Sequence, residues 1–157
     1  MSVINALAWA LDAGADRHDL AAAWAAGVCV PIPLGHRWEV VRLTSRLGYA
    51  ALARTVDLGT VGPVLRTAST MTLEVVVPRG TAAAWPALPS TCATAAGTLL
   101  CPPPAATVST PRAHGRLWVH SPAHAVAPTD PDALCEAAAA TLAHMRTHEA
   151  ATSEVPR

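Results

Sequence analysis

Two glutamates stand in hydrophobic segments that are rich in strand-forming residues. Glu39 lies in the segment WEVVRL, and Glu74 lies in TMTLEVVV. If the two strands were neighbours, the carboxylates could form a pair for general acid–base catalysis. Buried carboxylates commonly find an arginine, so we favour a structural role for both acids. The candidate partners are Arg42, Arg66 and Arg116.

A second candidate site is the segment RLWVH, in which Arg116, Trp118 and His120 alternate with Leu117 and Val119. In a strand the first three side chains would project together, while the two aliphatic residues would face inward. A guanidinium, an indole and an imidazole on one sheet face could stack a base and contact a phosphate. The alternative is that Trp118 packs beneath a helix and the two polar residues are incidental.

The histidines and cysteines form no recognisable metal or nucleophile motif. His144 and His148 are four residues apart on an expected helix, but a zinc site needs three or four ligands. The four cysteines are scattered, with no C-x-x-C pair, and Cys101 has no basic neighbour in sequence to activate its thiol. No P-loop and no G-x-S-x-G motif is present. We therefore expect neither a bound metal nor a cofactor.

Length and composition limit the classes of partner. At 157 residues the chain is the size of one domain, which we expect to span 1–150, with a disordered tail over 151–157. Eleven basic residues, all arginine, balance eleven acids, so no global field favours nucleic acid or an anionic membrane. No apolar run approaches the roughly 20 residues that span a bilayer, and we expect a cytoplasmic protein without a membrane partner.

The elements that must position these residues follow from periodicity and turn residues. The pattern predicts two N-terminal helices within an extension over 1–30, the second capped by Asp16 or Asp19. Over 36–146 it predicts strand, helix, a hairpin turning at Ala68 and Ser69, a helical turn, two strands and a long final helix. Thr129 or Asp130 would cap that helix. The predicted fold class is α+β, a largely antiparallel sheet covered by helices.

The order WEVVRL, helix, GPVL, TLEVVVPRGTAAAW, GTLLCPPP, GRLWVHSP and TDPDAL resembles the N-terminal domain of actinobacterial bifunctional DNA primase/polymerase proteins, and more closely their short stand-alone relatives. The resemblance covers roughly residues 36–143. It implies a member of the archaeo-eukaryotic primase superfamily, whose core is a sheet like that of the RNA-recognition motif. The composition, rich in Ala, Thr, Pro and Arg, is also typical of a GC-rich genome such as an actinobacterial one.

Active members of that superfamily carry two metal-binding acids, one residue apart, at the end of the strand that corresponds to WEVVRL. The positions here are Arg42 and Thr44, and neither side chain can hold magnesium as a carboxylate does. Glu39 lies three residues from Arg42 and therefore faces the other way. The resemblance thus implies a degenerate site that has lost polymerase and primase chemistry; whether the chain is an enzyme of another kind stays open.

Three classes of function remain open. The first is a non-catalytic primase-like module that binds a nucleotide or a single-stranded nucleic acid, or acts as an adaptor, with Arg42, Arg66, Arg116, Trp118 and His120 as ligand-binding residues. The second is a protein-interaction module or homodimer in which Trp9 and Trp24 of the N-terminal helices form the interface. The third is an enzyme with an unrecognised site built from Glu39, Glu74 and His120.

Overall fold

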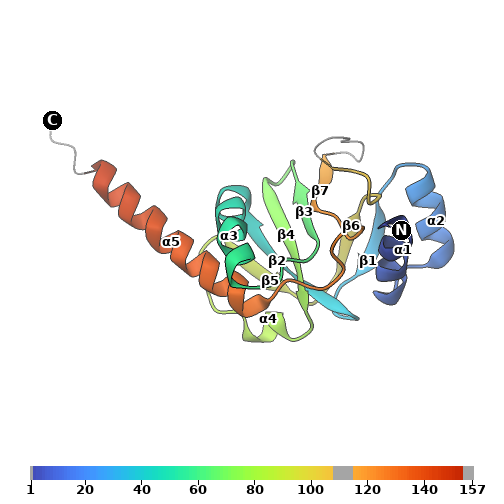
Figure 1. Ribbon diagram of the computed structural model, residues 1–157, viewed down its shortest axis with the longest axis horizontal. Helices are drawn as coiled ribbons and strands as arrows, with labels where there is room; N and C mark the ends of the chain where they lie inside the picture. Colours follow the sequence, from blue (N-terminus) through green and yellow to red (C-terminus); the bar gives the residue numbers. More distant parts are fainter. Residues whose placement is uncertain (1, 108–114, 154–157) are drawn as a thin grey trace.

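A computed structural model of the chain describes residues 2–107 and 115–153, with five helices and seven strands among them (Figure 1). The fold is α+β with antiparallel sheets, as predicted. The elements are α1 (Ser2–Asp12), α2 (Arg17–Ala25), β1 (Val30–Pro33), β2 (Trp38–Thr44), α3 (Ser45–Leu58), β3 (Val64–Thr67), β4 (Thr72–Pro78), α4 (Thr81–Ala84), β5 (Thr91–Thr94), β6 (Thr98–Cys101), β7 (Arg116–His120) and α5 (Pro131–Ser153).

The main sheet has the strand order β5-β2-β4-β3-β7, and every pairing in it is antiparallel. Strands β2 and β3 both run against β4 and are therefore parallel to each other, with α3 connecting them. Strands β4 and β5 both run against β2 and are likewise parallel to each other, and the single helical turn α4 connects them along the chain. These two interlocked βαβ units are the split arrangement of ferredoxin-like folds. The order agrees with the RNA-recognition-motif type of core that the family resemblance implies.

One face of this sheet is covered by α3 and α5, which lie side by side (Figure 1). Their core includes Val41, Val75, Leu134 and Ala138, all buried. Gly48 lets α3 approach β4 closely, because a Cβ there would lie 2.7 Å from the Leu73 Cδ1 atom. Burying each of these valine and leucine side chains contributes about 1.5 to 3 kcal/mol to folding.

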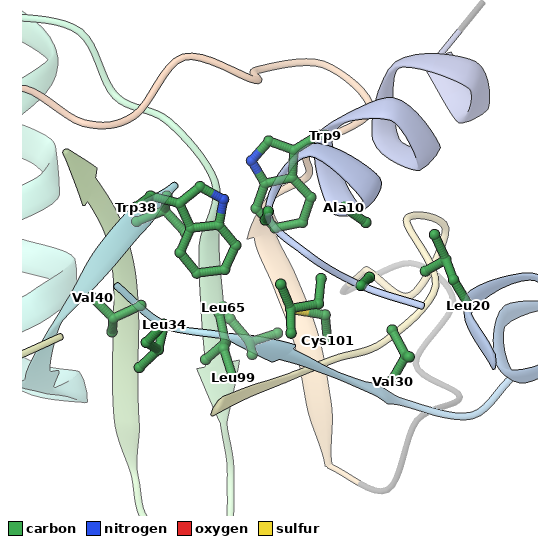
Figure 2. Close-up of a cluster of buried hydrophobic side chains, with 14 of the residues drawn as sticks. Trp9, Ala10, Leu20, Val30, Leu34, Trp38, Val40, Leu65, Leu99 and Cys101 are labelled. Carbon is green, nitrogen blue, oxygen red and sulfur yellow. The ribbon is translucent and has the colours of Figure 1, made fainter. Parts of the chain in front are cut away.

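The other face is covered by a two-stranded ribbon of β1 and β6 and, beyond it, by α1 and α2 (Figure 1). Three tryptophans meet in this core. The rings of Trp9 and Trp38 stack with centroids 5.0 Å apart, and the rings of Trp9 and Trp118 form a T-shaped pair with centroids 5.9 Å apart. Figure 2 shows the first two rings above Leu65, Leu99 and Cys101. The predicted N-terminal extension is therefore part of the core.

Helix capping follows the sequence closely. Asp16 accepts backbone hydrogen bonds from His18 and Asp19 at the start of α2, and Asp130 accepts from Asp132 and Ala133 at the start of α5. The hairpin of β3 and β4 turns where predicted. By contrast, α5 continues to Ser153, so part of the expected disordered tail is helical. Residues 154–157 of that tail lie outside the described residues.

Candidate functional site

Glu74 is the centre of a charged cluster on the sheet face beneath the β1–β6 ribbon. Its Oε2 accepts a hydrogen bond of 3.0 Å from Arg42 Nε, and its Oε1 accepts one of 3.0 Å from Thr67 Oγ1 and one of 3.4 Å from Arg116 Nη1. The carboxylate is 5% exposed, against 38% for Arg42 and 23% for Arg116. Both oxygens are therefore committed to donors of the protein itself, which is the structural role that the sequence favours.

Glu39 lies on the opposite face and also has two donors. Its Oε2 accepts from the backbone N–H of Gly80 at 2.7 Å, and its Oε1 accepts from that of Ala82 at 2.8 Å. The carboxylate thus holds the first turn of α4, where free N–H groups and the helix dipole favour an anion. Glu39 and Arg42 face opposite ways, as predicted, because Arg42 pairs with Glu74 and Glu39 with Val77. Glu39 and Glu74 consequently cannot form a catalytic pair.

The expected binding face on β7 does not exist in the predicted form. Trp118 is 1% exposed, and its Nε1 donates to the Pro102 carbonyl at 3.0 Å. The prediction of an exposed stacking platform is wrong because the ribbon and the N-terminal helices cover that face. Leu117 and Val119, which we expected to face inward, are only partly buried, and Trp118 is the buried residue of β7. The tryptophan is a core residue.

His120 is separated from Arg116 and Trp118 by a β-bulge. Trp118 is opposite Leu65, but a register shift then places His120 opposite Val64. Because Leu65 and Val64 point to opposite faces of the sheet, so do Trp118 and His120. The structure therefore brings Arg116 to the Glu74 cluster and takes His120 away from it. A single extra residue in the strand is the reason that alternation predicted the wrong face.

Partial burial lowers the pKa of His120 from its ordinary value of 6.5. The unfolded chain then takes up a proton at higher pH than the folded chain, so stability falls as the pH drops through 6.5 and levels off below the folded-state pKa. We expect His120→Gln to flatten this part of the stability curve in urea unfolding measured between about pH 5 and 8. Equal slopes in His120→Gln and the parent chain would contradict this.

Arg66, the remaining arginine of the predicted site, is not part of the cluster. Arg66 pairs with Leu73, so it lies on the sheet face that α3 and α5 cover. Glu74 lies on the opposite face, beneath the β1–β6 ribbon. Its Nε is buried and has no hydrogen-bond partner among the described residues. The site that the sequence proposes is thus divided between two faces, and only Arg42 and Arg116 come together.

The tryptophans of the predicted interaction surface are largely inside. Trp9 is 7% exposed and stacks on Trp38, so it offers no interface. Trp24 is partly buried, and its Nε1 donates to the Cys101 carbonyl at 3.1 Å. The prediction of a tryptophan-tipped docking pair is wrong for Trp9, because helix α1 packs its apolar face on the sheet.

The cysteines and histidines provide no metal site in the part of the chain that the structure describes, where no three His, Cys, Asp or Glu side chains gather to hold an ion. All four cysteines are free. Burial raises the pKa of Cys101 well above its ordinary value, and the nearby Glu74 carboxylate adds to this effect. Burial likewise raises the pKa of Cys29 and of Cys135. These three thiols are therefore poor nucleophiles at neutral pH.

Sequence reasoning missed two features. Thr67, the third donor to Glu74, carried no signal because a threonine in a strand is ordinary. The second is a hollow of about 510 Å³ whose lining includes Trp9, Trp38, Asp12 and Arg37. In the sequence, the adjacent residues Arg37 and Trp38 were the one sign of this hollow. The hollow itself forms only because α1 packs on β2.

Comparison of the chain with protein-family models, with curated proteins and with solved structures found no match in any of the three. Among the described residues, no helix is both long enough and apolar enough to cross a bilayer.

Proposed function

We propose that the protein is a non-catalytic, primase-like binding module whose ligand is a nucleotide. The observation that carries the proposal is that the carboxylates of both strand acids already accept hydrogen bonds from within the protein. Glu39 accepts two backbone hydrogen bonds, and Glu74 accepts from two guanidinium groups and a hydroxyl. Neither carboxylate is free to hold a metal ion or to take a proton from a substrate.

The arginines of the Glu74 cluster are the candidate contacts for the ligand. Two guanidinium groups face one carboxylate, which leaves one net positive charge in this cluster, although the formal charge of the whole chain is zero. Arg42 uses its Nε for Glu74, and its side chain is 38% exposed, so the end of the guanidinium remains accessible. Planar guanidinium groups bind phosphate through paired N–H donors. A phosphate group of a nucleotide fits this chemistry.

A single nucleotide is favoured over a nucleic-acid strand. Sheet-type modules bind single strands by stacking bases on exposed aromatic side chains of the sheet. Here that face lies beneath the ribbon and the N-terminal helices, and Trp118 is buried. The formal net charge is zero, which gives little attraction to a phosphate backbone.

The test is the shift in melting temperature that nucleoside triphosphates cause, measured relative to the unliganded melting temperature of each variant. We expect stabilisation of the parent chain that is lost in Arg42→Ala and Arg116→Ala and kept in Arg54→Ala, a variant of an exposed arginine on α3. No stabilisation by any nucleotide would refute the proposal. So would equal losses in all three variants, or tighter binding of a single-stranded oligonucleotide than of the mononucleotide.

A homodimer or protein-interaction module is the second candidate, and one observation favours it. A hollow of about 530 Å³ beside Trp24 is lined by mainly apolar residues, among them Ala26, Pro103 and Ala106. The occupant would be a second copy of the chain. Sedimentation velocity over a wide concentration range should then show a mass that rises with concentration and a smaller rise in Trp24→Ala. A constant monomer mass would exclude it.

The proposed cellular location is the cytoplasm, where nucleotides are available. The four free cysteines support a reducing compartment.

A further inference from the structure

Helix α5 extends beyond the rest of the domain for about half of its length. Figure 1 shows it lying along α3 and then projecting away from the sheets. Its buried residues all lie between Ala133 and Thr141. From 142 to 153, which we call the outer half of α5, Leu142 and Met145 are half-buried and every other residue is exposed. A stretch of helix about 18 Å long with nothing packed along it is only marginally stable in water.

A groove of about 300 Å³ lies beside this outer half. Its other walls are the start of α3, including Leu47, and the turn at Pro89 and Ser90. Four residues of α5 line the groove: Leu142, Met145, Arg146 and Glu149. At about 100° per residue all four lie within roughly 100° of one another around the helix axis, so they form one face. The outer half of α5 therefore presents a single face that is partly apolar and partly charged.

The charged groups of this groove have both signs and are unpaired. Arg46, Arg146 and Glu149 are exposed, and in the stretches that the structure describes none of the three has an ion-pair partner. A second α5 could lie antiparallel along the first, with the two-fold axis between Thr147 and His148. Because Arg146 and Glu149 are equally far from that axis along the chain, each arginine would then lie opposite the glutamate of the other copy. The face is therefore complementary to itself.

We propose that this groove is covered by the outer half of α5 from a second copy of the chain, in an antiparallel two-fold pair with reciprocal Arg146–Glu149 contacts. Leu142 and Met145 lose their remaining contact with water in this pair. The C-terminal end of the second helix also comes to the start of α3, where Thr44 gives no side-chain cap, so helix ends of opposite partial charge meet. The interface is small, and we expect a dissociation constant in roughly the micromolar range.

This surface is separate from those considered above. It shares no residue with the Glu74 cluster or with the hollow beside Trp24. The pairing through α5 therefore does not depend on the proposed nucleotide function, and it differs from a dimer formed at Trp24.

The test is sedimentation velocity at low ionic strength over a wide concentration range. The samples are the parent chain, Arg146→Glu, Glu149→Arg and an equimolar mixture of these two variants. We expect the parent chain to approach the mass of a dimer. Each variant alone should self-associate at least roughly tenfold more weakly, because both reciprocal contacts become repulsive. The mixture should associate again, because every carboxylate then faces a guanidinium group.

The matched control is Arg79→Glu, the same charge reversal at an exposed arginine outside the groove, which should leave the association unchanged. A parent chain that stays monomeric would overturn the proposal, as would a mixture that associates no better than either variant alone. A weakening by Trp24→Ala as large as that by Arg146→Glu would also overturn it, because the contact would then lie at the hollow beside Trp24.

Discussion

Glu74→Gln is expected to lower the free energy of unfolding by about 3 kcal/mol, because it leaves two guanidinium groups without their charged partner. The full cost of breaking a buried ion pair is about 3 to 5 kcal/mol, and the lower end applies since the Arg42 side chain is 38% exposed. The new amide also presents N–H donors to the Thr67 hydroxyl and the arginines. Urea unfolding of the variant and of the parent chain measures this change in the free energy of unfolding when both proteins have the same m-value.

The matched control is Glu136→Gln, the same substitution at an exposed position of α5. We expect it to change the free energy of unfolding by less than about 0.5 kcal/mol. Equal effects at the two positions would mean that the Glu74 cluster does not stabilise the sheet. Replacing Glu74, Arg42 and Arg116 together by methionine should recover part of the loss, because no buried charge then remains unpaired.

Glu39→Ala is expected to lower the free energy of unfolding by about 2 to 4 kcal/mol, because two backbone N–H groups of the α4 turn lose the carboxylate that accepts their hydrogen bonds. Glu39→Gln keeps one side-chain acceptor and should lose roughly half as much. Glu39→Ala should also speed hydrogen exchange at the backbone N–H groups of Gly80 and Ala82, which donate to the carboxylate in the parent chain.

The exchange measurement separates a local role from a global one. If Glu39 only fills space, Glu39→Gln, which keeps the side-chain volume, will leave stability almost unchanged, and in Glu39→Ala exchange will rise evenly over β2 and β4. Faster exchange confined to the α4 turn is the result that its hydrogen bonds predict. An unchanged exchange rate at Gly80 and Ala82 would contradict the cap.

Local signals predicted much of the fold. Asp16 and Asp130 begin helices because their side chains accept from free backbone N–H groups, and the β3–β4 hairpin follows from two strand-forming runs around a turn. The strand β5 had no such signal, because TCAT is short and polar and its pairing with β2 is decided by tertiary contact. In α3, Leu47, Ala51 and Leu52 are buried, whereas Val56, four residues after Leu52, is 54% exposed.

The candidate site was less predictable than the fold. Alternation correctly separated Glu39 from Arg42, because β2 is regular over its whole length. It failed at β7 for two physical reasons: a bulge moved His120 to the other face, and the ribbon buried the face of Trp118. The pairing of Trp9 with Trp38 joins residues that lie 29 positions apart in the chain, and no local pattern encodes such a contact.

We propose that Glu39 and Glu74 serve structure and that the chain carries out no nucleotidyl transfer. The most direct measurement is nucleotide incorporation on primed and unprimed templates with magnesium or manganese, using the parent chain beside Glu39→Gln and Glu74→Gln. We expect no incorporation by any of the three proteins. Metal-dependent incorporation by the parent chain that either variant abolishes would contradict it.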